Sequence, residues 1–135
     1  MANSLYSKGR QGFLDGSIDW DTDDIRVVLV DLADYVVDLA VHEFLSSVPA
    51  LARVAVSASL TAKTATDGVA DAADITFTSV TGDVSEALVI YKHTGTDTTS
   101  RLIAYIDTAT GLPVTPDGGN ITVAWDGAAD RIFRL

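Results

Sequence analysis

Short apolar segments and turn signals follow one another along most of this chain, and their spacing limits the folds that it can adopt. From residue 51 onward, segments that favour a β-strand recur about every 8–15 residues, with turn signals between them. This spacing is typical of an antiparallel β-sandwich or a small β-barrel. The second half is also rich in Thr and β-branched residues, which favour strands. We therefore expect a mainly β fold.

Three segments are apolar on both faces, as expected of strands that are buried on both sides of a sheet. They are Ile25–Val30, Ala87–Lys92 and Leu102–Ile106. Further strands are predicted at residues 51–56, 59–66, 74–79, 121–125 and 131–135. Tight turns are predicted at Asp67-Gly68, Gly82-Asp83 and Asp126-Gly127, and a long turn at residues 110–119.

A short helix is predicted at residues 4–14, near the start of the chain. Ser4 is a candidate N-cap, Leu5 and Phe13 share a helical face, and Gly16 follows the expected end. Two glycines inside the segment lower its helix propensity by about 1 kcal/mol each relative to Ala. The helix is therefore expected to dock on another surface, because it would fray on its own.

The spacing of apolar residues predicts a second short helix at residues 39–48, with Asp38 as its cap and Pro49 after its end. Both helices precede the β-rich part, where they can cover one end of the sheets. The chain has no internal repeat and no linker composition. Residues 1–135 are thus expected to form one domain, in which residues 1–16 are a short helical docking segment.

The composition excludes several classes of protein. The chain has no cysteine, which rules out a disulfide framework, a cysteine nucleophile and a cysteine-based metal site. The first residues lack the apolar stretch of a signal peptide, and no apolar run is long enough to span a bilayer. We therefore expect no membrane partner.

The net charge of −10 comes from 19 acidic and 9 basic residues. Nucleic-acid binding requires clustered Lys and Arg, whereas the basic residues here are scattered, so no nucleic-acid partner is expected. Such a charge keeps free copies apart and promotes solubility. It also suits a partner that presents a basic patch.

The motifs of common enzymes are missing. His42 lacks the second histidine of a zincin helix, because Ser46 stands four residues later. His93 has no base or nucleophile near it in sequence. Neither a nucleophile elbow nor a phosphate-binding glycine loop occurs. The chain is therefore expected to be non-catalytic and to bind no cofactor.

One acidic stretch resembles half of a calcium-binding loop. Asp19, Asp21 and Asp23 alternate as the first ligands of such a loop do. Asp24 stands where the loop needs glycine, and Val30 where it needs a closing glutamate. These three aspartates are a weak calcium candidate, and a solvated turn is the favoured interpretation.

Three groups of residues carry a resemblance to a known family. The first is residues 2–6 with Lys8-Gly9, Phe13-Leu14 and Ile18-Asp19-Trp20. The second is Leu60-Thr61, Lys63-Thr64, Asp67-Gly68, Asp71, Ala72 and Asp74. The third and most specific is Ala87–Lys92, residues 102–107, Gly111-Leu112-Pro113, Gly118-Gly119, residues 121–125 and Arg131-Ile132-Phe133. Together they resemble small virion structural proteins of tailed bacteriophages, over nearly the whole chain.

The resemblance implies a structural protein of the virion, made in the cytoplasm of the host bacterium. Members of the group look like head decoration, or cement, proteins, so binding to the outer surface of the capsid is the expected role. The expected partners are the major capsid protein or another virion protein, and further copies of the chain in a homo-oligomer such as a trimer. The alternatives are a tail, neck or fibre-associated structural protein, and a β-sandwich on the virion that binds carbohydrate.

A decoration protein must be soluble at high copy number and must adhere only to the shell. A terminal segment that becomes ordered on binding is a natural docking element. The apolar side chains of the N-terminal segment and of the connection after it are therefore the interface candidates: Leu5, Tyr6, Phe13 and Trp20.

Overall fold

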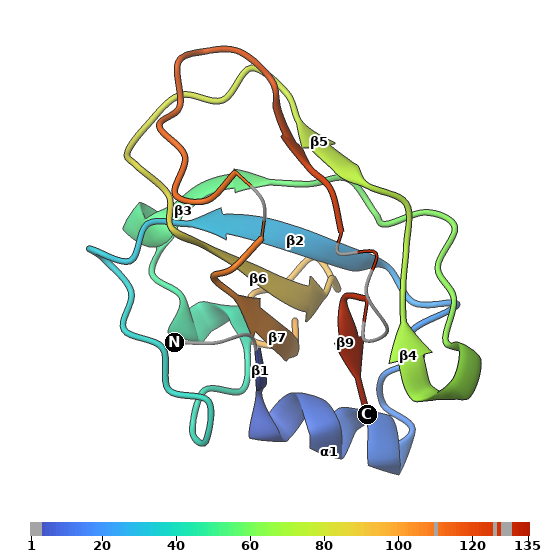
Figure 1. Ribbon diagram of the computed structural model, residues 1–135. Coiled ribbons are helices and arrows are strands. Elements are labelled where there is room, and N and C mark those ends of the chain that lie inside the picture. Colours follow the sequence, from blue (N-terminus) through green and yellow to red (C-terminus); the bar gives the residue numbers. More distant parts are fainter. Residues whose placement is uncertain (1–3, 110, 126, 128–130) are drawn as a thin grey trace.

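A five-stranded antiparallel sheet forms the centre of the molecule, with its strands in the order β1-β7-β6-β2-β3 (Figure 1). The computed structural model describes residues 4–109, 111–125, 127 and 131–135. The strands of this sheet are β1 (Ser4–Leu5), β2 (Ile25–Val30), β3 (Arg53–Val56), β6 (Ala87–Lys92) and β7 (Leu102–Ile106). The three segments expected to be buried on both faces are the three inner strands, and their predicted bounds are confirmed.

Both faces of this sheet are buried, because a separate apolar layer covers each of them. Val27, Leu29 and Leu88 belong to one core, and Val28 and Val89 belong to the other. All five side chains are inaccessible to solvent. Neighbouring residues of a strand point to opposite faces, so a two-sided apolar sequence supplies both cores at once.

One extra residue in β7 changes which side chains face each core. Ile90 pairs with Ala104 and Tyr91 pairs with Leu102, so Ile103 has no residue opposite it in β6. The resulting β-bulge sends Ile103 and Ala104 into the same core.

Two short antiparallel sheets cover the first face. They consist of β5 (Ile75–Phe77) with β8 (Ile121–Val123), and of β4 (Val69–Ala70) with β9 (Phe133–Arg134). Ile75 and Phe77 are buried and Thr76 between them is exposed, which confirms the predicted alternation. The small sheets and the large sheet enclose one core, so the fold is mainly β and sandwich-like, as predicted.

An irregular segment, residues 31–52, covers the second face. It contains two short 3₁₀ turns, η1 (Leu45–Ser47) and η2 (Ala50–Ala52). Its buried side chains Tyr35, Leu45 and Val48 join the second core. The predicted helix at residues 39–48 is therefore wrong.

Tertiary hydrogen bonds explain why that helix does not form. Asp38 does cap a turn, since its Oδ1 accepts two backbone N–H groups at 3.1 and 3.2 Å. The chain then becomes extended, because Leu45 N–H donates to the Ser100 carbonyl and Leu102 N–H donates to the Glu43 carbonyl. Pairing with the residues around the start of β7 overrides a weak helical preference.

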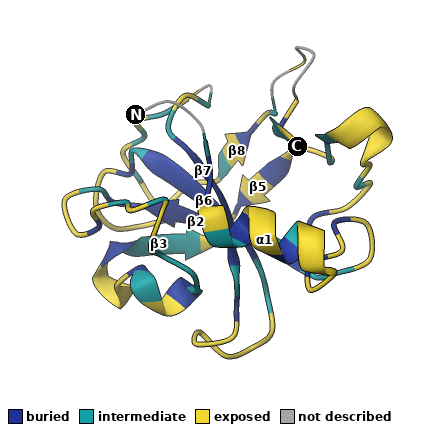
Figure 2. Ribbon diagram, turned by 90° about the horizontal axis from the view of Figure 1, so that it is seen from below, coloured by how far each residue is buried: buried dark blue, intermediate teal, exposed yellow. Residues whose placement is uncertain are grey.

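The N-terminal helix, α1 (Ser7–Asp15), lies against β7 and turns its exposed side outward (Figure 2). It begins later than predicted, because Ser4 and Leu5 form β1 and pair with β7. Ser4 is thus not an N-cap, and Leu5 does not share a helical face with Phe13. The predicted end is confirmed: Gly16 has a φ of +80°, the left-handed conformation that glycine adopts without strain.

The predicted strand at residues 59–66 does not form. Ala62 has a φ of +52°, which lies outside the strand region, and only an isolated bridge joins Thr64 to Asp71. The turn at Asp67-Gly68 is confirmed within η3 (Thr66–Gly68) by positive φ values of 55° and 77°.

The remaining predicted strands are shorter in the structure. Residues 51–56 contribute β3 only after η2, and residues 74–79, 121–125 and 131–135 contribute β5, β8 and β9. A bend at Gly82-Asp83 and the irregular course of residues 111–119 agree with the predicted turns. Residues 1–3 of the docking segment, Thr110 of the long turn and Asp126 of the last turn lie outside the described residues.

Candidate functional site

The structure places most of the interface candidates inside the folded chain. Leu5, Tyr6 and Trp20 are buried, with exposed fractions of 6%, 0% and 4%. Phe13 is half-buried and packs against Phe133 of β9 at a ring-centroid distance of 5.8 Å. These side chains hold the N-terminal segment on its own domain, so the three buried ones present no surface to a partner in this structure.

The calcium candidate forms a hydrogen-bonded turn. Asp19 Oδ1 accepts the backbone N–H groups of Asp21 and Thr22 at 3.1 and 3.3 Å. Asp23 Oδ2 accepts the Asp19 N–H at 2.8 Å and lies 3.1 Å from Lys92 Nζ. The carboxylates of Asp19 and Asp23 therefore cap the turn, and Asp23 also pairs with a cation of this chain, as a solvated turn would.

A different group of carboxylates converges at one end of the large sheet. Oxygen atoms of Asp31, Asp34 and Asp83 all lie within 4.8 Å of one another. Asp31 is buried, and its Oδ1 accepts the Ala33 N–H at 2.8 Å, whereas Asp34 and Asp83 are exposed. Carboxylate oxygens are the ligands that Ca²⁺ and Mg²⁺ prefer, so these are the described residues best placed to hold a cation.

Glu86 adds a fourth carboxyl group to this end of the sheet. Its Oε2 is buried and has no hydrogen-bond partner among the described residues. Burial and the nearby charge of Asp31 raise the pKa of Glu86 above its ordinary value. In the described part of the chain, no Lys or Arg pairs with any of these four carboxylates, so their charge is uncompensated.

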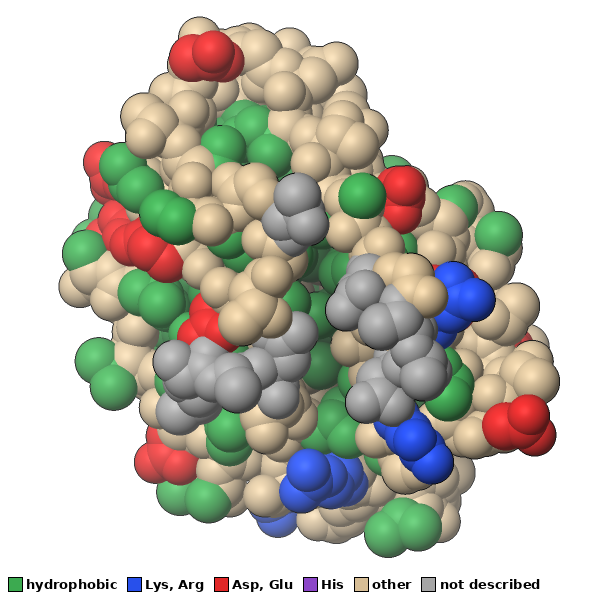
Figure 3. Space-filling model, in the orientation of Figure 1, with side chains coloured by type: hydrophobic (Ala, Val, Ile, Leu, Met, Phe, Trp, Pro, Cys, Tyr) green, Lys and Arg blue, Asp and Glu red, His purple; other side chains and the backbone are tan. Residues whose placement is uncertain are grey.

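Exposed apolar side chains accompany these carboxylates. Val36, Leu51 and Val84 have exposed fractions of 86%, 81% and 44%. The Asp31 N–H donates to the Ala52 carbonyl at 2.9 Å, which brings the segment of Leu51 to the segment of Val36. Figure 3 shows acidic and hydrophobic side chains mixed along the left edge of the view, which is the side where β2 ends in Figure 1. We call the seven residues the acidic end: Asp31, Asp34, Val36, Leu51, Asp83, Val84 and Glu86.

No local sequence motif indicates the acidic end. Its residues come from three segments that are far apart in the chain and that meet where β2 ends and where β3 and β6 begin. The only available signal is indirect: antiparallel neighbours bring these strand ends to the same edge of a sheet.

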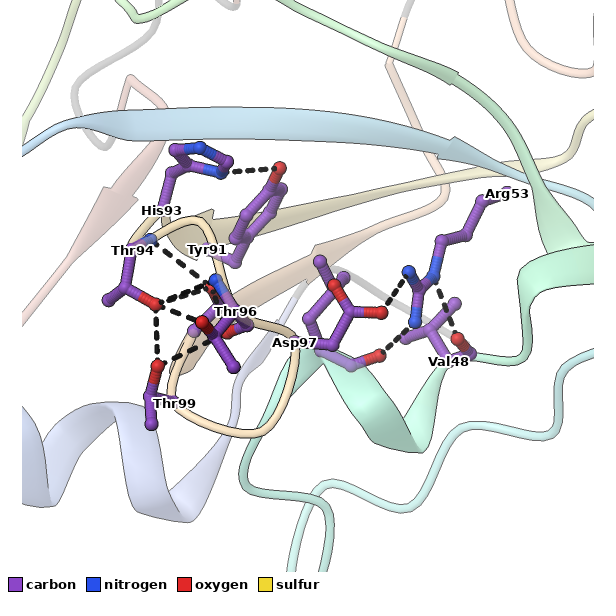
Figure 4. A network of polar contacts seen from close by, with 10 residues as sticks. Val48, Arg53, Tyr91, His93, Thr94, Thr96, Asp97 and Thr99 are labelled. Carbon is purple, nitrogen blue, oxygen red and sulfur yellow. Dashed lines mark hydrogen bonds and ion pairs between the residues drawn. The ribbon is translucent and has the colours of Figure 1, made fainter.

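The side chains of Thr94, Thr99 and Ser100 form hydrogen bonds within the loop between β6 and β7 (Figure 4). Thr94 Oγ1 lies 2.6 Å from Thr99 Oγ1, and Ser100 Oγ donates to the Thr96 carbonyl at 2.9 Å. The Thr94 N–H donates to Ser100 Oγ at 3.2 Å. These bonds fix the shape of the loop.

Arg53 of β3 joins this loop to the irregular segment (Figure 4). Its Nε donates to the Val48 carbonyl at 2.9 Å, and its Nη2 donates to the Leu45 carbonyl at 2.8 Å. Its Nη1 lies 2.7 Å from Asp97 Oδ2. Arg53 thus acts as a structural connection between three segments.

Both histidines contact tyrosines. Nδ1 of His42 lies 2.8 Å from the Tyr35 hydroxyl, and Nδ1 of His93 lies 3.5 Å from the Tyr91 hydroxyl (Figure 4). The Tyr35 hydroxyl also lies 2.8 Å from the hydroxyl of Tyr6. Burial and this neighbouring Tyr35 raise the pKa of Tyr6 far above its ordinary value. These tyrosines are therefore neutral packing groups.

Both tryptophans are held by backbone carbonyl groups. Trp20 Nε1 donates to the Asp71 carbonyl at 3.2 Å, and Trp125 Nε1 donates to the Ala73 carbonyl at 3.1 Å. Trp20 is buried and Trp125 is half-buried, so Trp20 offers no open ring face to a sugar.

Within the described residues, no helix is both long enough and apolar enough to cross a lipid bilayer. The chain matches no protein-family model, and no curated protein is similar to it.

Proposed function

We propose that the protein is a decoration protein of a tailed-bacteriophage head, which binds the outer surface of the capsid. The sequence resemblance points to this class of virion protein. The structural observation that supports the role is the acidic end, where uncompensated carboxylates lie beside exposed apolar side chains. We further propose that the acidic end is the surface that docks on the capsid.

The chemistry of the acidic end determines what it fits. Docking surfaces combine apolar contacts with complementary charge, and the charge sets specificity and the rate of encounter. The matching patch on a capsid protein would present Lys or Arg around an apolar centre. Such a patch would relieve the repulsion between the carboxylates, including the buried Glu86 oxygen that lacks a partner among the described residues.

The contacts of the aromatic and histidine side chains favour docking over the other functions considered. Trp20, the central aromatic of the acidic stretch, is buried and hydrogen-bonded, which disfavours stacking on carbohydrate. Among the described residues, the ring nitrogens of His42 and His93 lie beside tyrosine hydroxyl groups. A neck or tail position is the remaining alternative, and copy number distinguishes it.

Quantitative mass spectrometry of purified virions tests the position on the particle. A head decoration protein should be present in several hundred copies per particle. A copy number of three, six or twelve would contradict the proposal and favour the neck or the tail.

Binding to capsids that lack the protein tests the docking surface. The double variant Asp34→Lys/Asp83→Lys and the variant Leu51→Asp should each reduce capsid occupancy at least about tenfold, since each replaces a complementary contact with a repulsive or polar one. Asp21→Lys and Leu14→Asp are matched controls, because they make the same kinds of change at exposed positions elsewhere. Equal binding by all variants would overturn the assignment of the acidic end.

A further inference from the structure

Three arginines line one hollow beside α1 and β9. Arg10 belongs to α1, Arg131 precedes β9 and Arg134 lies in β9. The hollow has a volume of about 350 Å³, and its lining includes the apolar residues Leu5 and Ile106. We call it the arginine hollow.

This concentration of positive charge contrasts with the rest of the chain. The whole sequence has 9 basic and 19 acidic residues, and three of the basic ones line this hollow. Figure 3 shows Lys and Arg side chains gathered in the lower and right part of the view, where α1 and β9 lie in Figure 1, with an acidic side chain at the right edge beside them, while further acidic side chains lie along the left edge. The molecule therefore carries regions of opposite charge on different parts of its surface.

The three arginines reach the solvent. Arg10, Arg131 and Arg134 are all exposed. Arg131 Nη1 lies 3.9 Å from Asp71 Oδ2, a long ion pair that leaves 48% of the Arg131 side chain exposed. A surface ion pair of this kind contributes little to stability, so a ligand can displace it.

The charge of the hollow favours an anionic group as the ligand. A guanidinium group binds a carboxylate or a phosphate group through two parallel hydrogen bonds. Three arginines around a short hollow do not provide the extended basic track that a nucleic-acid backbone needs. The chain itself, with its 19 acidic residues, is an abundant source of carboxylates.

We propose that the arginine hollow binds exposed carboxylates of a second copy of this chain. The contact would join two different surfaces, because the hollow itself presents arginines. Repetition of such a contact between unlike surfaces produces closed rings, such as trimers, or filaments. The inference concerns the isolated protein and does not depend on binding to a capsid.

Sedimentation velocity of the full chain tests the proposal. The protein should self-associate at about 50 mM salt and less strongly at about 1 M salt, where the Debye length falls to about 3 Å. Arg10→Glu and Arg134→Glu should each weaken the association at least tenfold. Lys8→Glu is the matched control, because it makes the same change of charge on α1 at a residue that does not line the hollow.

Circular dichroism and thermal unfolding of each variant establish that it is folded. A wild-type protein that stays monomeric at every concentration and salt level would overturn the proposal. Self-association that is equally strong in the Arg10→Glu and Arg134→Glu variants would also overturn it.

Crosslinking identifies the carboxylates involved. Arg134→Lys places a primary amine at the hollow, and a carbodiimide then joins this amine to a carboxylate in contact with it through an amide bond, with loss of water to the carbodiimide. In a mixture of normal and heavy-isotope-labelled protein, the proposal predicts crosslinks that join a normal peptide to a labelled peptide, which shows that the two come from different copies. If the introduced amine crosslinks only within one copy, the proposal is wrong.

The two proposals can fail separately. Loss of capsid binding with intact, salt-sensitive self-association would reject the docking role of the acidic end and would leave the arginine hollow supported. The reverse result would reject only the arginine hollow.

Discussion

The hydroxyl oxygen of Tyr6 lies 2.8 Å from the hydroxyl oxygen of Tyr35, which in turn lies 2.8 Å from His42 Nδ1. The Asp38 N–H also donates to this nitrogen, at 3.2 Å, so His42 Nδ1 acts as an acceptor. Tyr35 must then donate its proton to His42 and accept the proton of Tyr6. This ordered chain of bonds connects the end of β1 to the irregular segment that covers the second core.

Tyr35→Phe is expected to lower the free energy of unfolding by about 1–3 kcal/mol, because it breaks both hydrogen bonds and leaves the buried Tyr6 hydroxyl without an acceptor. Urea unfolding measures the change. Tyr6→Phe is the control, since it removes one bond and leaves Tyr35 bonded to His42, and it should cost less. An equal or larger loss in Tyr6→Phe would contradict the proposed direction of the bonds.

Gly9→Ala is expected to destabilise the protein by about 1–3 kcal/mol, because α1 packs on β7 too closely for a side chain. A Cβ atom at Gly9 would lie 2.8 Å from the carbonyl oxygens of Leu102 and Ile103. Helix propensity alone predicts the opposite sign, a gain of about 1 kcal/mol. Thermal unfolding decides between them, with Gln11→Ala at an exposed position of the same helix as the control.

Glu86→Gln should make stability less dependent on pH. The raised pKa of Glu86 means that the folded state binds its proton more tightly than the unfolded state, whose value is near 4.5. The favourable contribution of the protonated group is present below that value and is lost as the pH rises through the folded-state pKa. The variant should therefore be more stable than wild type at neutral pH, and the two should converge in acid.

Urea unfolding over a range of pH checks this prediction. Asp21→Asn supplies the same change of charge at an exposed position. If that control reproduces the gain at neutral pH, net charge and not the burial of Glu86 is responsible.

Arg53→Ala is expected to cost about 1.5–3 kcal/mol, because it removes charge-assisted hydrogen bonds to the carbonyls of Leu45 and Val48. Asp97→Asn should cost less than about 1 kcal/mol, since Asp97 is 54% exposed and its ion pair is screened by solvent. Hydrogen exchange should show faster opening of η1 in the Arg53 variant. Equal losses in both variants would indicate that the ion pair, and not the carbonyl contacts, holds the segment.

The inner strands can be predicted because one property of their sequence, apolar character on both faces, is enough to identify them. Residues 87–91 and Leu102–Ile106 are apolar on both faces, and every residue in them is buried whichever face it occupies. The prediction of a helix at residues 39–48 fails because the apolar spacing is local, whereas the backbone bonds that replace the helix come from Ser100 and Leu102.

The candidate site cannot be predicted from the sequence. Asp19, Asp21 and Asp23 form a visible pattern because they are close together, yet that proximity lets them cap their own turn. Asp31 and Asp83 have no local relationship and meet only because two strand ends share one edge of the sheet. The interface candidates are apolar, and apolar residues serve a domain's own core as readily as a partner.

The packing of Phe133 against Phe13 and Trp20 has a consequence for biosynthesis. One core takes side chains from the first and the last described segments, so it cannot close until the ribosome has released residues 131–135. Until then the nascent chain carries an unfinished apolar surface, and contacts this distant in sequence form slowly. At that stage the net charge of −10 opposes contact between neighbouring unfinished chains.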